Sequence, residues 1–426
     1  MEADATTSPE LSVNVQVEAA HTAFLNLNLV PDRVRCQTLK QIAIALDADR
    51  AQILEANTLD LEACQDMAIP DLLREWLKLT PERLAHTIQA LHDLSGLVSP
   101  MLTAPAMGTA LDMGQTTAGS YMQRVPIGVI ALIYEALPEL SAMMAGLCLL
   151  TGNSLILRGG SEASHSNQVI VQIIQSVLEA SELPTHCVSF LSPDQGATLK
   201  ELVTLNQSID LIIPYGRPSL VQQVLRQATA PVLRPGIGNC YLYWSASANL
   251  DVVRWLLMDS HASDPDPVNA IEKVLLDPGL KDYALKTLWS SLRDAGFELR
   301  GEASLVEKFP ELQLAQPTEW SEPYLTRTIA FREVETVDAA ITWINRYSSG
   351  HADSIATESY GESRLFAQSL KSATVHINSS PRFYRNPNHG YHLAIGMSNQ
   401  PGSHWGRIGI ESLTTLKQVT LGHERI

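Results

Sequence analysis

The chain has little of what marks a disulfide-stapled or thiol-redox protein. Only 5 of its 426 residues are cysteine, and they form neither a Cys-x-x-Cys pair nor a metal-ligand spacing. A chain of this length buries a core that needs no disulfide bonds. We therefore expect free thiols and a reducing, cytoplasmic location. The five residues are Cys36, Cys64, Cys148, Cys187 and Cys240.

Basic residues and long apolar runs are also scarce. Lys and Arg number 30 against 46 Asp and Glu, which gives a formal net charge of −16. This balance disfavours a nucleic acid or an anionic membrane surface as partner. No apolar run is as long as a membrane span, and residues 1–9 lack the basic and apolar parts of a signal peptide. We expect small-molecule or protein partners, and a disordered tail at residues 1–12.

The hydrophobic pattern predicts two α/β domains. Apolar residues recur at helical spacing from residue 13 to about 97, and Thr80-Pro81-Glu82 is a typical helix start. Strand-like runs then alternate with helical ones, which predicts a parallel sheet and a Rossmann-like fold. The predicted strands are 125–134, 154–158, 187–191, 210–214 and 231–233, and then 271–276, 328–331, 353–356 and 374–377.

These patterns set the predicted boundaries. A helical region and a Rossmann-like nucleotide-binding domain occupy residues 13–250, and a second α/β domain of catalytic type occupies 251–385. Residues 386–426 are expected to form an arm that returns to the first domain or to an oligomer interface. Ligands of such sheets bind beyond the carboxyl ends of the strands.

Several strings resemble the γ-glutamyl phosphate reductases (glutamate-5-semialdehyde dehydrogenases) of proline biosynthesis, in the aldehyde dehydrogenase superfamily. They follow the family's order over nearly the whole chain. Among them are Arg124-Val125-Pro126-Ile127-Gly128, Ile133-Tyr134-Glu135-Ala136, Arg158-Gly159-Gly160-Ser161-Glu162, Gly236-Ile237-Gly238 and Gly409-Ile410-Glu411-Ser412.

The resemblance implies a fold and a chemistry. The fold is an α/β aldehyde dehydrogenase fold, with a Rossmann-like cofactor domain, a catalytic domain and an oligomerisation arm that makes a dimer or tetramer. In the family's reaction a cysteine thiolate attacks L-glutamate 5-phosphate, and NADPH reduces the thioester to the semialdehyde. NADP(H) is therefore the implied cofactor.

The family's nucleophile position holds valine here. Aligned on Pro265 and Asn269, the cysteine of the family's Arg-Pro-Ser-Thr-Cys-Asn-like segment corresponds to Val268. No cysteine occurs after Cys240, so a shift in register does not recover one. Cys148, Cys187 and Cys240 lie in or beside apolar elements and are predicted to be buried structural thiols.

The oxyanion position differs as well. The family's Ala-Arg-Pro-Asn segment reads Ala136-Leu137-Pro138-Glu139, so a carboxylate occupies the place of the asparagine donor. A carboxylate there is expected to repel an oxyanion.

The sequence retains only some of the residues that the family resemblance assigns to cofactor binding. The resemblance places tentative cofactor contacts at Arg158, Gly159, Gly160, Ser161, Glu162, Pro214, Gly216 and Gly236. The family's Pro-Arg-Gly-Gly turn has become Pro214-Tyr215-Gly216-Arg217, and Thr328 stands where a ribose-binding carboxylate is expected. The same glycines also suit any tight strand-to-helix turn.

Two hypotheses follow. In one, the protein is a non-catalytic homologue that acts as a binding or regulatory protein, through its surface, its oligomer or another protein. In the other, it is an active reductase that transfers hydride directly, without a covalent intermediate. Loss of a catalytic nucleophile favours the first. His389, His392 and His404 are loop histidines, and we expect no metal site.

Overall fold

The computed structural model describes residues 13–97, 119–192, 199–263, 265–386, 392–400 and 404–421. The chain divides into two compact units: unit 1 comprises Met1–Leu233, Asn386–Ile395 and Gly409–Ile426, and unit 2 comprises Arg234–Arg385 and Gly396–Ile408. The predicted tail at 1–12 lies outside the described residues.

The predicted domain boundary at residue 250 differs from the observed division after Leu233. Strand β7 (Cys240–Trp244) pairs with β8 (Ile271–Leu276) and β12 (Ala352–Ala356) in the sheet of unit 2. The sequence misplaced it because its apolar run reads like the strands of the first domain.

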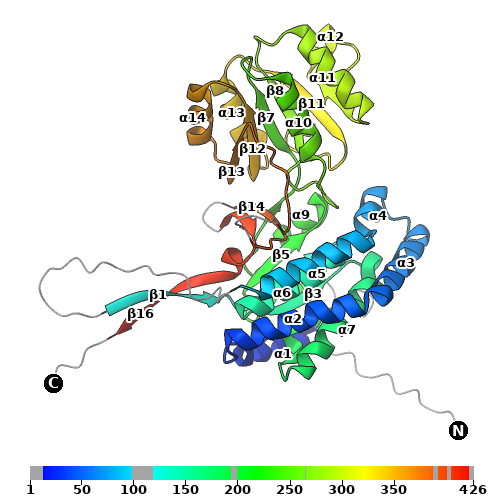
Figure 1. Cartoon of the computed structure of the whole chain (residues 1–426), viewed down its shortest axis with the longest axis vertical. Helices are drawn as coiled ribbons and strands as arrows, with labels where there is room; N and C mark the ends of the chain where they lie inside the picture. Colours follow the sequence, from blue (N-terminus) through cyan, green and yellow to red (C-terminus); the bar gives the residue numbers. More distant parts are fainter. Residues whose placement is uncertain are drawn as a thin grey trace, which may run out of the picture. The chain divides into compact units, whose positions relative to one another are not determined.

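Unit 1 begins with helices, as predicted. Thr80 caps the fifth helix: its side-chain oxygen accepts a hydrogen bond from the Arg83 N–H at 3.2 Å, and Pro81 follows as the first helical residue. The second and fifth helices pack against each other (Figure 1). The helices are α1 (Val13–Leu27), α2 (Asp32–Ala48), α3 (Arg50–Asp66), α4 (Asp71–Leu77) and α5 (Pro81–Ser95).

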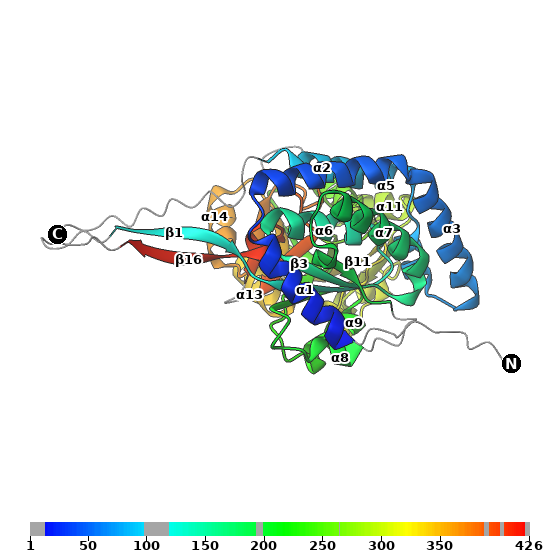
Figure 2. The same ribbon diagram turned by 90° about the horizontal axis from the view of Figure 1, so that it is seen from below.

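The sheet of unit 1 has four parallel strands in the order β4-β3-β2-β5. Helix α1 covers one face, where Val17 and Ala20 pack with Ala131 and Ile133 (Figure 2). The strands are β2 (Val129–Tyr134), β3 (Ser154–Arg158), β4 (Val188–Phe190) and β5 (Leu211–Tyr215), and the helices between and after them are α6 (Glu139–Thr151), α7 (Ser164–Ala180), α8 (Leu199–Val203) and α9 (Pro218–Gln227). This is the predicted Rossmann-like arrangement.

Two predicted strands need correction. The run 125–134 is not one strand, because Gly128 adopts a positive φ of 145° and breaks it into β1 (Gly119–Pro126) and β2. The break is fixed by Asn153, whose side-chain oxygen accepts from the Gly128 N–H at 2.8 Å. The predicted strand 231–233 reduces to a single bridge between Ile212 and Val232.

The predicted arm, residues 386–426, is divided between the units: Asn386–Ile395 and Gly409–Ile426 belong to unit 1, and Gly396–Ile408 belongs to unit 2. Strand β16 (Thr414–Leu421) pairs antiparallel with β1 over their whole lengths, from Gly119 opposite Leu421 to Pro126 opposite Thr414 (Figure 1). Within the described residues this two-stranded ribbon is a sheet of its own.

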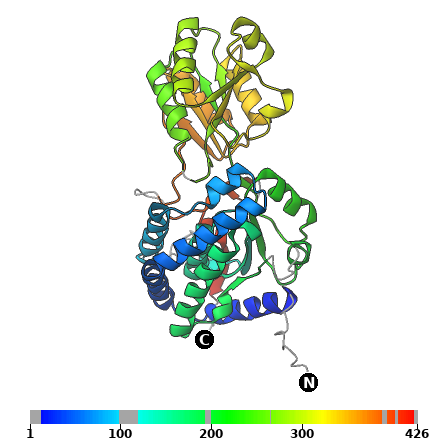
Figure 3. The same cartoon turned by 90° about the vertical axis from the view of Figure 1, so that its right-hand side faces the viewer.

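Unit 2 is built on a seven-stranded parallel sheet, in the order β10-β9-β11-β8-β7-β12-β13, with helices on both faces (Figure 3). Alternate residues of β7 point to opposite faces: Leu242 and Trp244 join one core cluster, and Tyr241 and Tyr243 join another. Both faces of the sheet are therefore buried.

Between residues 295 and 327 unit 2 contains two short strands and a short α-helix that were not predicted, whereas its other remaining elements follow the predicted alternation. Together these elements are α10 (Leu250–Ser260), α11 (Asp282–Asp294), β9 (Glu298–Gly301), α12 (Ala303–Lys308), β10 (Gln313–Leu314), β11 (Thr328–Glu333), α13 (Val337–Tyr347), α14 (Tyr360–Ser369) and β13 (Thr374–Ile377). A separate three-stranded sheet contains β6 (Pro235–Gly236), β14 (Gly396–Gln400) and β15 (His404–Ile408).

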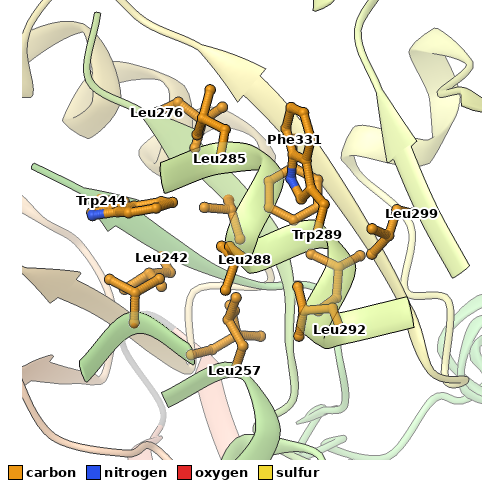
Figure 4. Packing of buried hydrophobic residues seen from close by; sticks show 14 of the residues in the cluster. Leu242, Trp244, Leu257, Leu276, Leu285, Leu288, Trp289, Leu292, Leu299 and Phe331 are labelled. Carbon is orange, nitrogen blue, oxygen red and sulfur yellow. The ribbon is translucent and has the colours of Figure 1, made fainter. Parts of the chain in front are cut away.

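The larger core cluster of unit 2 packs leucine, isoleucine and valine side chains around Trp244, Trp289 and three phenylalanines; Figure 4 shows part of it. The Trp289 ring on α11 is fully buried and meets Phe331 of β11 edge-on, with ring centroids 5.5 Å apart. Such packing makes the sheet a rigid support for the loops at its strand ends.

Candidate functional site

Seven of the eight predicted cofactor contacts lie together in unit 1. In the sheet register, Ile133 of β2 lies between Arg158 of β3 and Pro214 of β5. The loops that follow these three strands carry Gly159 to Glu162 and Gly216. Since the strands are parallel, these loops form one edge, which we call the strand-end edge. Gly236 is not at this edge because it belongs to β6 of unit 2.

A buried carboxylate occupies the turn after β3. Glu162 is 7% exposed, and its Oε1 accepts a hydrogen bond from the Ala136 N–H after β2 at 2.7 Å. A Cβ atom at Gly160 would collide with the same carboxylate. Burial raises the pKa of the Glu162 carboxyl above its usual value, and the hydrogen bond from the Ala136 N–H offsets only part of this effect. The glycine at 160 is thus required by an internal contact.

A second carboxylate lies across the turn after β5. Glu135 Oε2 accepts from the backbone N–H of Arg217 at 2.9 Å and from its Nε at 3.2 Å, and Oε1 accepts from Nη2 at 2.8 Å. This bidentate bond raises the pKa of the Arg217 guanidinium. Gly216, at φ 154°, lets the chain pass close to Glu135. Sequence reasoning noted Arg217 but missed its partner.

A third carboxylate holds the start of α7. Asp60 of α3 is 1% exposed, and it accepts from the backbone N–H groups of His165 at 2.9 Å and Ser166 at 2.8 Å. Asp60 also bonds the Ser166 hydroxyl and the Nδ1 of His165. It therefore satisfies the free N–H groups of this helix start, as a capping residue does.

Glu139, the residue at the predicted oxyanion position, is not an unpaired charge. It opens α6, is 3% exposed, and forms an ion pair with Arg83 of α5, which is 7% exposed. Arg83 Nε donates to Glu139 Oε1 at 3.2 Å, and Nη2 donates to the same oxygen. Arg83 therefore pairs with this carboxylate inside unit 1, and the predicted repulsion of an oxyanion by Glu139 stays a prediction. The arginine comes from the helical region, where no sequence motif marked it.

Val268, at the predicted nucleophile position, is completely buried in unit 2. Its carbonyl accepts from the Gly238 N–H at 2.9 Å and from Nε2 of His351 at 2.7 Å. Its own N–H donates to the Asp266 carbonyl at 2.9 Å. The backbone at 268 is thus fixed on both sides, and its side chain is a hydrocarbon without nucleophilic character.

His351 and Cys240 lie beside this backbone. The His351 Nε2 must carry a proton because it donates to a carbonyl, and burial lowers the pKa of the ring to about 4. The Cys240 Sγ lies 3.4 Å from that nitrogen and donates to the Gly238 carbonyl. Burial raises the pKa of Cys240 well above its usual value, so the thiol is neutral and buried. Gly236 packs against the His351 ring, where a Cβ would collide with it.

The neighbours of Val268 are bound within unit 2. Asn269 donates from its amide nitrogen to the Pro381 carbonyl at 2.7 Å. Asp266 is fully buried and forms an ion pair with Arg385. The other predicted structural thiols, Cys148 and Cys187, are buried as expected, although Cys187 lies in a 3₁₀ turn ahead of β4.

The part of the chain that the structure describes shows neither a metal-binding cluster nor a membrane-spanning helix. No group of three His, Cys, Asp or Glu side chains there could hold a metal ion. His389 lies outside the described residues. In the described segments, no helix is both long and apolar enough to cross a membrane.

Comparison with known proteins relates this architecture to one family. A sequence model of the aldehyde dehydrogenase family matches residues 3–237. The chain is 46% identical over 410 residues to gamma-glutamyl phosphate reductase 2 of Synechocystis sp., covering 96% of this chain and 97% of that protein. It is 34% identical to gamma-glutamyl phosphate reductase of Gloeobacter violaceus over 417 residues, covering 97% and 98%.

Solved structures agree. The crystal structure of gamma-glutamyl phosphate reductase from Thermotoga maritima matches with a TM-score of 0.84 and 32% identity, covering 96% of this chain and 98% of that one. A probable aldehyde dehydrogenase from Listeria monocytogenes shares the fold, with a TM-score of 0.71 and 15% identity over 97% of each chain. The chain belongs to the gamma-glutamyl phosphate reductase family, within the aldehyde dehydrogenases.

Proposed function

We propose that this protein is a non-catalytic member of its family that acts as a binding or regulatory protein. The reaction that the family name describes, reduction of L-glutamate 5-phosphate to its semialdehyde, links it to proline biosynthesis. The observation that carries the proposal is the state of residue 268. Val268 is a buried hydrocarbon with a hydrogen-bonded backbone, and the alignment on Pro265 and Asn269 matches it with the family's cysteine.

Among the described residues of unit 2, the cysteine thiol does not replace the missing nucleophile. Cys240 is the nearest thiol among the described residues, but it is fully buried, and burial holds its pKa far above neutral pH. His351 cannot act as its base through Nε2, because that nitrogen carries the proton it donates to Val268. A thioester therefore has no atom on which to form.

The aldehyde dehydrogenase fold contains a domain for a nicotinamide dinucleotide, which supplies hydride when bound. The residues at the strand-end edge do not fit its phosphates as they stand. Backbone N–H groups after β2, after β5 and at the start of α7 bond the carboxylates of Glu162, Glu135 and Asp60. The space beside Gly159 is likewise occupied by another side chain of the protein, since a Cβ there would collide with the Asn167 amide. We therefore propose no hydride-transfer step.

We propose that the protein acts as a homo-oligomer, a dimer or tetramer, in the cytoplasm. The β1–β16 ribbon supports this, because an isolated pair of strands is marginally stable by itself. Tyr121 on one face and Leu416 on the other are 46% and 48% exposed. Tyr121→Arg should shift the mass measured by light scattering toward a monomer, while Tyr283→Arg, on α11 of unit 2, should not. An unchanged mass would contradict assembly through the ribbon.

The loss of catalysis is tested by turnover. Purified protein is assayed for phosphate-dependent oxidation of glutamate 5-semialdehyde with NADP⁺ and with NAD⁺, beside the Thermotoga maritima protein as positive control. Val268→Cys is assayed in parallel, with Val253→Cys as a control for an added buried thiol. We expect no turnover from the unaltered chain. Turnover at a rate near that of the control would favour the active reductase with direct hydride transfer.

A further inference from the structure

Leu325 is held in a backbone conformation that leucine rarely adopts. It lies in residues 321–327, which connect the 3₁₀ helix η4 (Pro317–Trp320) to β11 and which we call the strap. Its φ is 58°, in the left-handed region, where a residue with a bulky side chain is strained. Such strain persists only where the surrounding contacts enforce it, and it is concentrated at ligand clamps and switch segments.

One buried carboxylate of unit 2 enforces this conformation. Glu272, on β8, is fully buried, and its Oε1 accepts a hydrogen bond from the Leu325 N–H at 2.7 Å. Its Oε2 accepts from the Tyr324 N–H at 2.8 Å and from the Asn239 N–H, just ahead of β7, at 2.8 Å. Asn239 is left-handed as well, with a φ of 54°. Glu272 thus bonds two left-handed residues that come from distant segments.

Lys273, the next residue on β8, fastens the strap a second time. Its Nζ donates to the Glu322 carbonyl at 3.3 Å and lies 3.5 Å from the centre of the Tyr324 ring. The same Nζ is 3.7 Å from Glu272 Oε2, so it is the counter-charge of that carboxylate. The strap itself reaches the surface, since Glu322 and Thr326 are exposed. A disturbance from solvent can therefore reach the strap although its attachments are buried.

Gly238 connects the strap to the predicted nucleophile position. A Cβ atom at Gly238 would lie 2.9 Å from both the Pro323 Cβ and the Glu272 Oε1, so the strap and the carboxylate pack directly on this backbone. The Gly238 N–H donates to the Val268 carbonyl at 2.9 Å. A single backbone residue therefore lies between the strap and residue 268.

We propose that the strap is a conformational switch: Glu272 holds it in a strained closed state, and its release loosens the backbone at residue 268. The coupling passes through Gly238, which contacts the strap on one side and bonds Val268 on the other. Opening of the strap from its exposed residues then changes residue 268 from a distance. The proposal goes beyond the loss of catalysis, since it concerns the mechanics of unit 2 and holds whether or not the protein turns over a substrate.

Substitutions at Leu325 change the strain without changing the volume. Leu325→Ile keeps the number of carbon atoms but branches at Cβ, which makes the left-handed conformation worse and suits the extended conformation of an open strap. Leu325→Met is the matched control, because it is unbranched at Cβ and of similar size. We expect the strap to open about 10-fold more often in Leu325→Ile and about as often as before in Leu325→Met.

The experiment reads the strap and residue 268 separately. The variant Val268→Cys supplies a thiol reporter, and peptide mass spectrometry follows its labelling by a thiol reagent, alone and combined with Leu325→Ile or Leu325→Met. Hydrogen exchange of peptides covering 321–327 and 236–241 is measured on the Leu325 variants without the reporter. We expect Leu325→Ile to raise the labelling rate at residue 268 about 10-fold and to speed the exchange of both peptides, and Leu325→Met to do neither.

Three outcomes would overturn the proposal. One is unchanged exchange of the strap in Leu325→Ile, and another is faster exchange of the strap without faster labelling at residue 268. The third is an equal acceleration in peptides of α11, which would mean general unfolding of unit 2.

Glu272→Gln is a second route to the open strap, because an amide nitrogen cannot accept from the backbone N–H groups that the carboxylate bonds. It should speed both readouts more than Leu325→Ile does, and equal rates in Glu272→Gln and the parent chain would also overturn the proposal. Should this variant not fold, the two Leu325 variants decide alone. Turnover is not read in any of these measurements, so failure of the switch is distinguishable from failure of the proposed loss of catalysis.

Discussion

Removal of Arg83 is expected to destabilise unit 1 strongly, because it strands a buried charge. Arg83 donates to Glu139, to the Trp76 carbonyl at 3.0 Å and to the Lys78 carbonyl. Arg83→Met would leave the Glu139 carboxylate, 3% exposed, without its counter-charge, and two carbonyls without this donor. Breaking one side of a buried ion pair costs about 3–5 kcal/mol in free energy of unfolding.

Glu139→Gln is the matched variant and should cost less, about 1–2 kcal/mol. It keeps an oxygen for Arg83 to bond, and the Oε2 that it replaces has no hydrogen-bond partner among the described residues. The double variant Arg83→Met/Glu139→Gln should be more stable than Arg83→Met by at least about 1 kcal/mol, since a neutral amide is cheaper to bury than a lone carboxylate.

The assay is urea unfolding followed by circular dichroism, with native-state hydrogen exchange of peptides from α5 and α6 to locate the effect. The prediction is contradicted if the loss of unfolding free energy in Arg83→Met/Glu139→Gln equals the sum of the losses in the two single variants. That result would mean that the two side chains contribute independently and that Glu139 is hydrated without Arg83.

Three further predictions concern pH, backbone and thiols. Burial lowers the His351 pKa from 6.5 to about 4, so between these pH values the unfolded state binds a proton that the native state does not. Acidification across this window should lower the free energy of unfolding by up to about 3 kcal/mol, and the drop in urea midpoint should be smaller for His351→Gln. Gly216→Ala should lower the free energy of unfolding by about 1–3 kcal/mol in thermal unfolding, because φ is 154° and the new Cβ would lie 2.7 Å from the Glu135 side chain. The control Gly361→Ala, near the start of α14, should be neutral or stabilising, and equal effects of the two variants would contradict this prediction. A thiol reagent should label at most Cys36 rapidly in the native protein and all five cysteines after unfolding; rapid native labelling of a second thiol would contradict the burial described.

Hydrophobic periodicity was sufficient to predict most of the fold. The predicted bounds of α13 and β13 are the observed ones, because both segments carry a complete local pattern bounded by polar residues. The sequence did not predict the β1–β16 pairing, which joins segments about three hundred residues apart. The strand break at Gly128 was missed for a related reason: it depends on Asn153, which lies in another loop.

The candidate site was predicted in its positions but not in its electrostatics. Val268 and Glu139 were identified by resemblance to a family motif, yet the partners that fix their environment come from remote elements. Arg83 is 56 residues from Glu139, and Arg217 is 82 residues from Glu135. Pairs of this kind leave no local periodicity, so a charged residue within an otherwise apolar helix face, such as Arg83, was the only available signal.

The most direct test of the account is mass spectrometry of the intact protein after incubation with an acylating substrate, either the acyl phosphate formed by glutamate kinase chemistry or an acyl phosphate analogue. The account predicts an unchanged mass for the natural chain, because Val268 offers no nucleophile and Cys240 is buried and protonated. An acyl adduct on any side chain of unit 2, formed at the rate of the Thermotoga maritima control, would contradict it.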